Sequence, residues 1–160
     1  MDSAQILHLY VSPGHNYFGR HGMAADNYPI LEQTEISCIA GRGIEGDRFF
    51  DYKPDYKGQI TFFAEEVYHS LSEELNVQGV SPSVFRRNAV TRGLDLNALI
   101  GVEFTVQGVR FLGTSECKPC YWMNSAFHPH AEDRLRGRGG LRAKILTSGH
   151  LSVSTVASTI

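Results

Sequence analysis

The chain lacks a strong excess of either charge: 15 Lys and Arg residues face 17 Asp and Glu residues, which gives a formal net charge of -2. This balance excludes a globally basic nucleic-acid-binding protein, although a local basic patch is still compatible with it. No uncharged apolar run approaches about 18 residues, so we expect no transmembrane helix. The N-terminal residues Met1–Gln5 carry an acid where a signal peptide has basic residues. We therefore expect a cytoplasmic protein with neither nucleic acid nor membrane as a partner.

Cysteine is scarce, and several well-known catalytic motifs are missing. Three cysteines, an odd number, fit a reducing compartment better than a disulfide framework. The chain contains no Gly-x-Ser-x-Gly, no His-Glu-x-x-His and no dinucleotide fingerprint after a strand. Its 160 residues suit one domain, which we place over residues 1–160 and which can bury a core without disulfide or metal support.

Short apolar stretches are the main structural signal in the sequence. Residues 6–11, 36–40 and 59–63 predict strands, and residues 12–29 predict an irregular loop. Three glycines within residues 41–48 predict a turn with positive φ. The best helix covers residues 65–76, where Val67, Leu71 and Leu75 form one apolar stripe.

The second half of the chain predicts mostly strands. Residues 103–111 alternate around Gln107 and Gly108, which is typical of a hairpin. Residues 143–147 and 151–156 flank Ser148-Gly149-His150 and predict a second hairpin. One strong helix among about six to eight short strands favours a mainly β fold, namely a β-barrel or closed sheet with a few peripheral helices.

The pair Cys117 and Cys120, separated by Lys118-Pro119, is the strongest candidate for chemistry. A thiolate beside Lys118 at a helix start could act as a nucleophile or a soft metal ligand. Alternatively, the pair supplies half of a zinc site. A thioredoxin-like dithiol lacks its βαβ context here, and two small buried thiols would need no function. The third cysteine, Cys38, lies in an apolar stretch and is expected in the core.

Two basic segments flank this pair in sequence. Arg86 and Arg87 precede a predicted strand and could bind an oxyanion, or they could form ordinary surface ion pairs. Residues 134–142 mix arginine with glycine, which suits a small anionic ligand better than RNA, although an exposed loop explains them equally. Residues 86–144 hold 10 basic and 5 acidic residues, whereas residues 1–85 hold 5 and 12. The near-zero total therefore hides a basic region around the cysteines.

Taken in order, these motifs resemble the MOSC domain, the module named after the C-terminal domain of molybdenum cofactor sulfurase. The resemblance covers about residues 5–156 and rests on Gly43–Arg48, Arg87–Gly93 with Leu94–Leu96 and Leu99–Gly101, Pro119-Cys120 and Arg138–Ala143. It implies a β-barrel-rich fold, binding of a molybdopterin-type cofactor, and one cysteine that ligates molybdenum or carries sulfane sulfur. The implied cysteine is Cys120, which follows the proline, and Cys117 is an extra thiol that could form a transient disulfide or resolve a persulfide.

The resemblance also implies the remaining site residues and the partners. Its motifs point to Asp47, Arg48, Arg87, Asn88, Arg138 and Gly139 as residues that bind a small anionic cofactor. The family includes cofactor sulfurases, which bind pyridoxal phosphate in a desulfurase domain, and reductases of N-hydroxylated compounds. We expect this chain to lack both that domain and an iron–sulfur domain, so a sulfur-transfer or reductase role would need a separate cysteine desulfurase or reductase.

One alternative comes from a different class of protein. A small binding module without catalysis could be stabilised by zinc held by Cys117, Cys120, His128 and His130. The spacing of the two histidines is shorter than in the usual zinc finger. Bound metal distinguishes the two hypotheses, because the first predicts molybdenum and the second predicts zinc.

Overall fold

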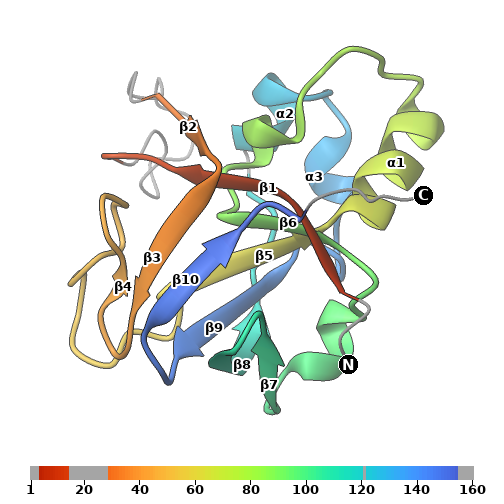
Figure 1. The fold of residues 1–160 in the computed structure, drawn as a ribbon. Coiled ribbons are helices and arrows are strands. Elements are labelled where there is room, and N and C mark those ends of the chain that lie inside the picture. The colour runs from red at the N-terminus through yellow and green to blue at the C-terminus, as the bar shows by residue number, and fades with distance from the viewer. Residues whose placement is uncertain (1–3, 15–28, 121, 155–160) are drawn as a thin grey trace.

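The protein is described by a computed structural model that covers residues 4–14, 29–120 and 122–154. Within these residues ten strands form two sheets (Figure 1). The larger sheet has the order β2-β1-β6-β5-β9-β8-β7, and the smaller one has the order β10-β3-β4. The strands are β1 (Gln5–Val11), β2 (Leu31–Gln33), β3 (Glu35–Ile39), β4 (Gly43–Ile44), β5 (Ile60–Ala64), β6 (Ala89–Arg92), β7 (Glu103–Val106), β8 (Val109–Glu116), β9 (Leu141–Ile145) and β10 (Gly149–Ser152).

The mainly β prediction is confirmed, but the predicted closed barrel is wrong. Strands β2 and β7 are the two edges of the larger sheet, and no pairing joins them within the described residues. The smaller sheet ends at β10 and β4 in the same way. Both sheets are therefore open, and their curvature brings them together without closure (Figure 1). Most of the predicted loop at 12–29 lies outside the described residues.

In the described part of the chain, three α-helices and two short 3-10 helices complete the fold. They are α1 (Glu65–Leu75), η1 (Pro82–Phe85), η2 (Leu96–Leu99), α2 (Trp122–Ala126) and α3 (Ala131–Arg134). The predicted helix over 65–76 is confirmed as α1, with Glu65 and Glu66 in its first turn and Asn76 in the left-handed conformation at its end. The α-helices gather at one end of the larger sheet (Figure 1). No helix in the described part of the chain is long and apolar enough to cross a membrane.

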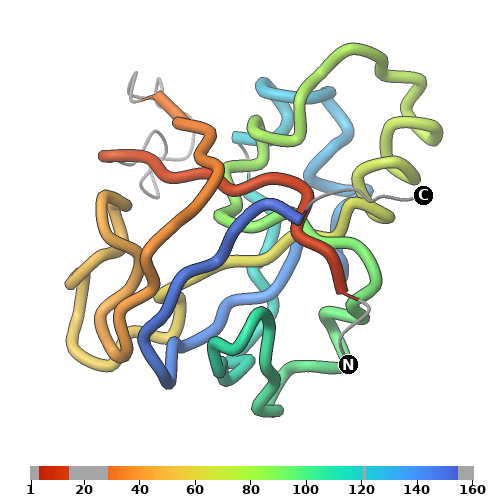
Figure 2. Tube along the Cα trace, viewed as in Figure 1, coloured from red at the N-terminus to blue at the C-terminus, as the bar shows by residue number. Residues whose placement is uncertain are grey.

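The two predicted hairpins have different outcomes. Strands β7 and β8 pair in an antiparallel register around Gln107 and Gly108, both with positive φ, as predicted. Strands β9 and β10 do not pair with each other. Strand β9 lies between β5 and β8, whereas β10 pairs with β3, so the chain passes from one sheet to the other at this turn (Figure 2). The second predicted hairpin is therefore wrong.

The described residues form two apolar core clusters. The larger lies between the sheets and includes Phe62, Phe111 and Cys38, which confirms the core position predicted for this cysteine. The smaller lies under the helices around Phe63, Phe85 and Met123. Arg86 and Arg87, which directly follow Phe85 of this cluster, contribute to the candidate site.

Candidate functional site

A cavity of about 190 Å³ opens beside the two neighbouring cysteines. It is formed by segments far apart in sequence: the loop before β5 and β5 itself, the link from η1 to β6, the residues that follow β8, the start of α2, and β9. The lining residues are Arg48, Phe49, Tyr56, Gly58, Thr61, Phe85, Arg86, Arg87, Cys117, Lys118, Cys120, Trp122 and Arg142. The fold thus assembles a thiol-containing cavity from both halves of the chain.

The cavity is strongly positive. Five of its lining residues are Arg or Lys, and none of the described residues that line it is acidic. Burial, together with the neighbouring charge of Arg48, lowers the pKa of Arg86 to about 10. Burial likewise lowers the pKa of Arg48, against the opposing effect of Asp47. An anion would relieve this repulsion, so the cavity favours anionic ligands.

Arg87 holds residues 117–120, the cysteine loop, through its guanidinium group. Its Nε donates to the Gly139 carbonyl at 3.0 Å, and its Nη1 donates to the Phe85 carbonyl at 3.0 Å. Its Nη2 donates to the carbonyls of Cys117 at 3.1 Å and Lys118 at 3.3 Å. Most of its donors therefore serve the backbone, and the residue is only 8% exposed. Arg87 lines the predicted site, as the sequence indicated, but its main contacts are to the protein.

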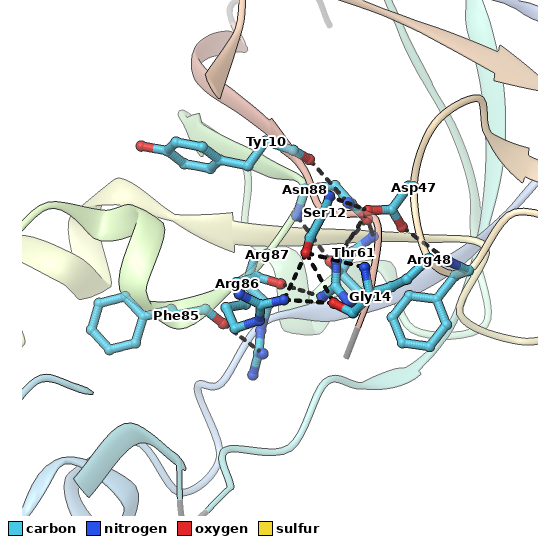
Figure 3. A network of polar contacts seen from close by, with 11 residues as sticks. Tyr10, Ser12, Gly14, Asp47, Arg48, Thr61, Phe85, Arg86, Arg87 and Asn88 are labelled. Atoms are coloured by element: carbon cyan, nitrogen blue, oxygen red, sulfur yellow. Dashed lines mark hydrogen bonds and ion pairs between the residues drawn. The ribbon is translucent and has the colours of Figure 1, made fainter. Parts of the chain in front are cut away.

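Asp47 and Arg48 join the glycine turn to the rest of the site (Figure 3). Positive φ at Gly46 allows this turn, as predicted. The Asp47 carboxylate accepts from the backbone N–H of Ser12 at 3.0 Å and from Arg48 Nη1 at 3.0 Å. Arg48 Nη2 donates to the Arg86 carbonyl at 2.9 Å. Arg48 lines the cavity, whereas Asp47 is buried behind it as a structural anchor.

Asn88 does not line the cavity. Its Oδ1 accepts from the backbone N–H of Thr61 at 2.9 Å, and its Nδ2 donates to the Tyr10 carbonyl at 3.1 Å. Its own backbone N–H donates to the Thr61 hydroxyl. These contacts cross-link β1, β5 and the start of β6 inside the protein (Figure 3). Asn88 thus holds strands together rather than facing a ligand.

Both predicted thiols, Cys117 and Cys120, line the same cavity. Cys117 is buried, and its backbone N–H donates to the Gly140 carbonyl at 2.7 Å. Cys120 is half-buried. Burial raises the pKa of the Cys120 thiol, although a backbone hydrogen bond from Trp122 and the charge of Arg87 act in the opposite direction. The sequence predicted a thiolate favoured by Lys118, whereas burial outweighs the cations here.

Arg138 and Gly139 are neighbours in sequence but have different surroundings. Arg138 lies outside the cavity and donates to the Glu74 carboxylate on α1 at 2.9 Å. Gly139 packs against the cysteine loop so closely that a Cβ there would lie 2.4 Å from the Cys117 carbonyl oxygen. The structure therefore places Gly139 at the site and keeps Arg138 away from it.

Tyr56 and the indole of Trp122 line the cavity, and the sequence did not single them out. Arg142, which also lines the cavity, was included only as part of the arginine–glycine segment 134–142. It had a local signal as well, because it is a charged residue between the apolar residues Leu141 and Ala143 of a strand. Alternation of this kind predicts that Arg142 points away from the core. It does not say that a cavity lies on that side.

The four proposed zinc ligands do not form a metal site. Within the described residues no group of three or more His, Cys, Asp or Glu side chains could hold a metal ion. His128 Nδ1 instead accepts from the backbone N–H of His130 at 3.0 Å. The zinc-stabilised module has no structural support.

Comparisons with known proteins agree with the sequence motifs and the fold. The family model for the MOSC domain matches residues 45–156. A search of curated proteins finds no match. Among solved structures, YuaD from Bacillus subtilis is 17% identical with a TM-score of 0.68, and the match covers 94% of this chain and 91% of that one.

Two further solved structures share the fold. YiiM from Geobacillus stearothermophilus is 12% identical with a TM-score of 0.65, and the match covers 93% of this chain and 71% of that one. YiiM from Escherichia coli is 20% identical with a TM-score of 0.58, and the match covers 93% and 72%. Because the family model matches most of the chain, this protein belongs to the MOSC domain family.

Proposed function

We propose that this MOSC protein binds a molybdopterin-type cofactor at the cysteine cavity, with the Cys120 thiolate as the group that ligates molybdenum or carries sulfane sulfur. One observation carries the proposal. Five basic side chains and two thiols meet in one cavity that has no acidic residue among its described lining. Such a cofactor is anionic at its dithiolene and phosphate groups, and thiolate is a soft ligand.

The residues present fit this group chemically. Cys120 would hold the molybdenum, and Arg48, Arg86 and Arg87 would supply positive potential around the anionic ligand. The bound cofactor would supply a metal centre suited to two-electron chemistry. A cavity of about 190 Å³ is smaller than the roughly 300–1,000 Å³ of sites that enclose a drug-sized ligand, so it would enclose only one end of the cofactor.

Burial of Cys120 has a consequence for this role. Because its pKa is raised, the free thiol is held protonated more than an exposed cysteine would be. Binding of a metal cation requires the thiolate and releases that proton. We therefore expect the free thiol to be less reactive than an exposed cysteine until a bound metal replaces its proton.

Two reactions are compatible with such a site. In sulfur transfer, a cysteine desulfurase would load sulfane sulfur on Cys120. In reduction of N-hydroxylated compounds, a separate reductase would deliver electrons to the bound cofactor. The desulfurase and the reductase are both part of the proposal. We also propose that the protein acts in the cytoplasm.

The test compares wild type with Cys120→Ser and Cys117→Ser after expression in a molybdenum-replete host. Bound molybdenum is measured by elemental mass spectrometry, bound pterin by fluorescence after oxidation, and persulfide by alkylation and peptide mass spectrometry. We expect Cys120→Ser to contain at least about tenfold less bound molybdenum or persulfide than wild type, because the serine hydroxyl is a hard ligand and a poor nucleophile.

Cys117→Ser is the matched comparison, since it removes a thiol from the same cavity. We expect it to retain bound molybdenum and pterin, with circular dichroism confirming that both variants are folded. Equal molybdenum and pterin in wild type and Cys120→Ser, with no persulfide in either protein, would contradict the proposal.

A further inference from the structure

The basic side chains of the cavity fall into two groups. Arg48 and Arg87 direct donors to Asp47 and to backbone carbonyls of the protein. Arg86 belongs to the same group, because its Nη2 donates to the Ser12 hydroxyl and to the Gly14 carbonyl. By contrast, the side chains of Lys118 and Arg142 make no hydrogen bond or ion pair with any other residue in the described ranges. These two cations keep their donors available for a ligand.

Strand β9 explains why Arg142 faces the cavity. Its residues alternate, so Leu141, Ala143 and Ile145 are buried in the core while Arg142 and Lys144 lie on the other face. Lys144 Nζ is paired with the Asp55 carboxylate at 3.0 Å and does not line the cavity. Of these two cations on one face of one strand, only Lys144 has a carboxylate partner, and only Arg142 lines the cavity.

The stem of Arg142 is confined by its neighbours. A Cβ at Gly58 would lie 3.4 Å from Cδ of Arg142 and 3.1 Å from the Tyr56 ring, so these groups pack tightly together. Thr61, the cross-strand neighbour of Arg142 on β5, also lines the cavity. Packing of this kind limits the conformations of the side chain and reduces the entropy lost when its guanidinium binds a ligand.

We infer that Arg142, assisted by Lys118, is the anion-binding residue of the cysteine cavity and that its ligand is a tetrahedral oxyanion of the phosphate or sulfate class. A guanidinium binds such an anion through two parallel hydrogen bonds, and the ammonium of Lys118 adds a point charge. Five positive charges without a carboxylate in the described lining favour a divalent anion over a monocarboxylate. The identity of the natural ligand rests on the proposed function, but the anion site itself does not.

The first experiment titrates the purified protein with inorganic phosphate at constant ionic strength, because added salt alone would screen the cavity. Trp122 is the only tryptophan of the chain and lines the cavity, so its fluorescence reports binding, and calorimetry repeats the measurement. We expect Arg142→Gln to weaken phosphate binding by at least about tenfold, as for a lost charged hydrogen bond. Lys144→Gln, which removes the same charge from the same strand, should stay within about twofold of wild type.

The second experiment measures bound pterin and molybdenum in the same variants. Selective loss in Arg142→Gln supports an anion site that receives the phosphate ester of the cofactor, and phosphate binding blocked in loaded protein supports the same assignment. Phosphate binding unchanged by loading supports a site for a free oxyanion.

The inference is overturned by equal phosphate affinity and equal pterin content in wild type and Arg142→Gln. It is also overturned if Lys144→Gln weakens binding as much as Arg142→Gln does, since net charge alone would then explain the effect. If Cys120→Ser keeps its molybdenum and pterin, the proposed function fails, whereas the phosphate titration still decides the role of Arg142.

Discussion

At the scale of single residues, Arg87 connects the cysteine loop to the sheet. Its guanidinium donates to the carbonyls of Phe85 at the end of η1, of Cys117 in the cysteine loop and of Gly139. We expect Arg87→Lys to lower the free energy of unfolding by about 2–4 kcal/mol, because one ammonium cannot reach all these acceptors and leaves buried carbonyls unpaired. Urea unfolding measures this change, and the rate of Cys120 alkylation should rise as the loop loosens.

Arg92→Lys is the control for this change. Arg92 is exposed and pairs with Glu65 at 2.6 Å, so its replacement should cost less than about 1 kcal/mol and leave alkylation of Cys120 unchanged. If Arg87→Lys behaved like Arg92→Lys, the loop would be held by its other contacts, such as the bond from the Cys117 N–H to the Gly140 carbonyl.

The sequence predicts residues of the site better than it predicts their contacts. Cys117, Cys120, Arg48 and Arg87 do line one cavity, which matches the motif order. Asn88 and Arg138 stand in the same motifs but face the interior and Glu74. A motif fixes the position of a residue along the chain, whereas the direction of a side chain depends on strand pairing and on partners far away in sequence.

At the scale of elements, the segment between α3 and β9 presses on the cysteine loop through Gly139. A Cβ at this position would lie 2.4 Å from the Cys117 carbonyl oxygen and 2.8 Å from the Pro119 ring. Gly139→Ala must therefore displace the loop, and we expect it to lower stability by about 2–3 kcal/mol and to reduce bound molybdenum several-fold. Urea unfolding and elemental analysis of the same preparation measure the two effects.

Gly137→Ala tests whether the loss of molybdenum expected in Gly139→Ala comes from contact with the cysteine loop or from backbone strain. Gly137 has a φ of +80° and open space around its Cβ position, so alanine there should cost about 1 kcal/mol without loss of molybdenum. A loss of molybdenum in Gly137→Ala equal to that in Gly139→Ala would mean that contact with the cysteine loop is not what matters.

Strands are predictable from alternation, but their partners are less so. The β7–β8 hairpin follows from Gln107 and Gly108, because a two-residue turn forces its flanking strands together. Ser148-Gly149 suggested a hairpin of β9 and β10 in the same way. However, β10 pairs with β3, and Gly149 is already the first residue of β10. The partner of β10 is decided by long-range strand pairing and by burial, and the residues of the local turn predict neither.

At the scale of the whole molecule, the mainly β composition could be predicted from the sequence, whereas the openness of the two sheets could not. Mainly β composition was predictable from short alternating stretches, but closure depends on whether edge strands meet, and β2 and β7 do not. The uneven charge along the sequence was also informative, since four of the five cavity cations come from residues 86–144. The fifth, Arg48, comes from the acidic half and is held beside Asp47.

A site assembled from such distant segments exists only in the folded chain, so its ligand should stabilise the whole molecule. Cofactor at 100 times its dissociation constant would add about 2.7 kcal/mol, which corresponds to roughly 5–10 °C in Tm for a chain of this size. We expect this difference between wild type from a molybdenum-replete host and wild type from a host that cannot make molybdopterin. Cys120→Ser from the two hosts should unfold at one temperature, because it retains little cofactor. A Tm difference that persisted in Cys120→Ser would show that the ligand binds without this thiol, and equal Tm values for the two wild-type preparations would show that no cofactor is bound.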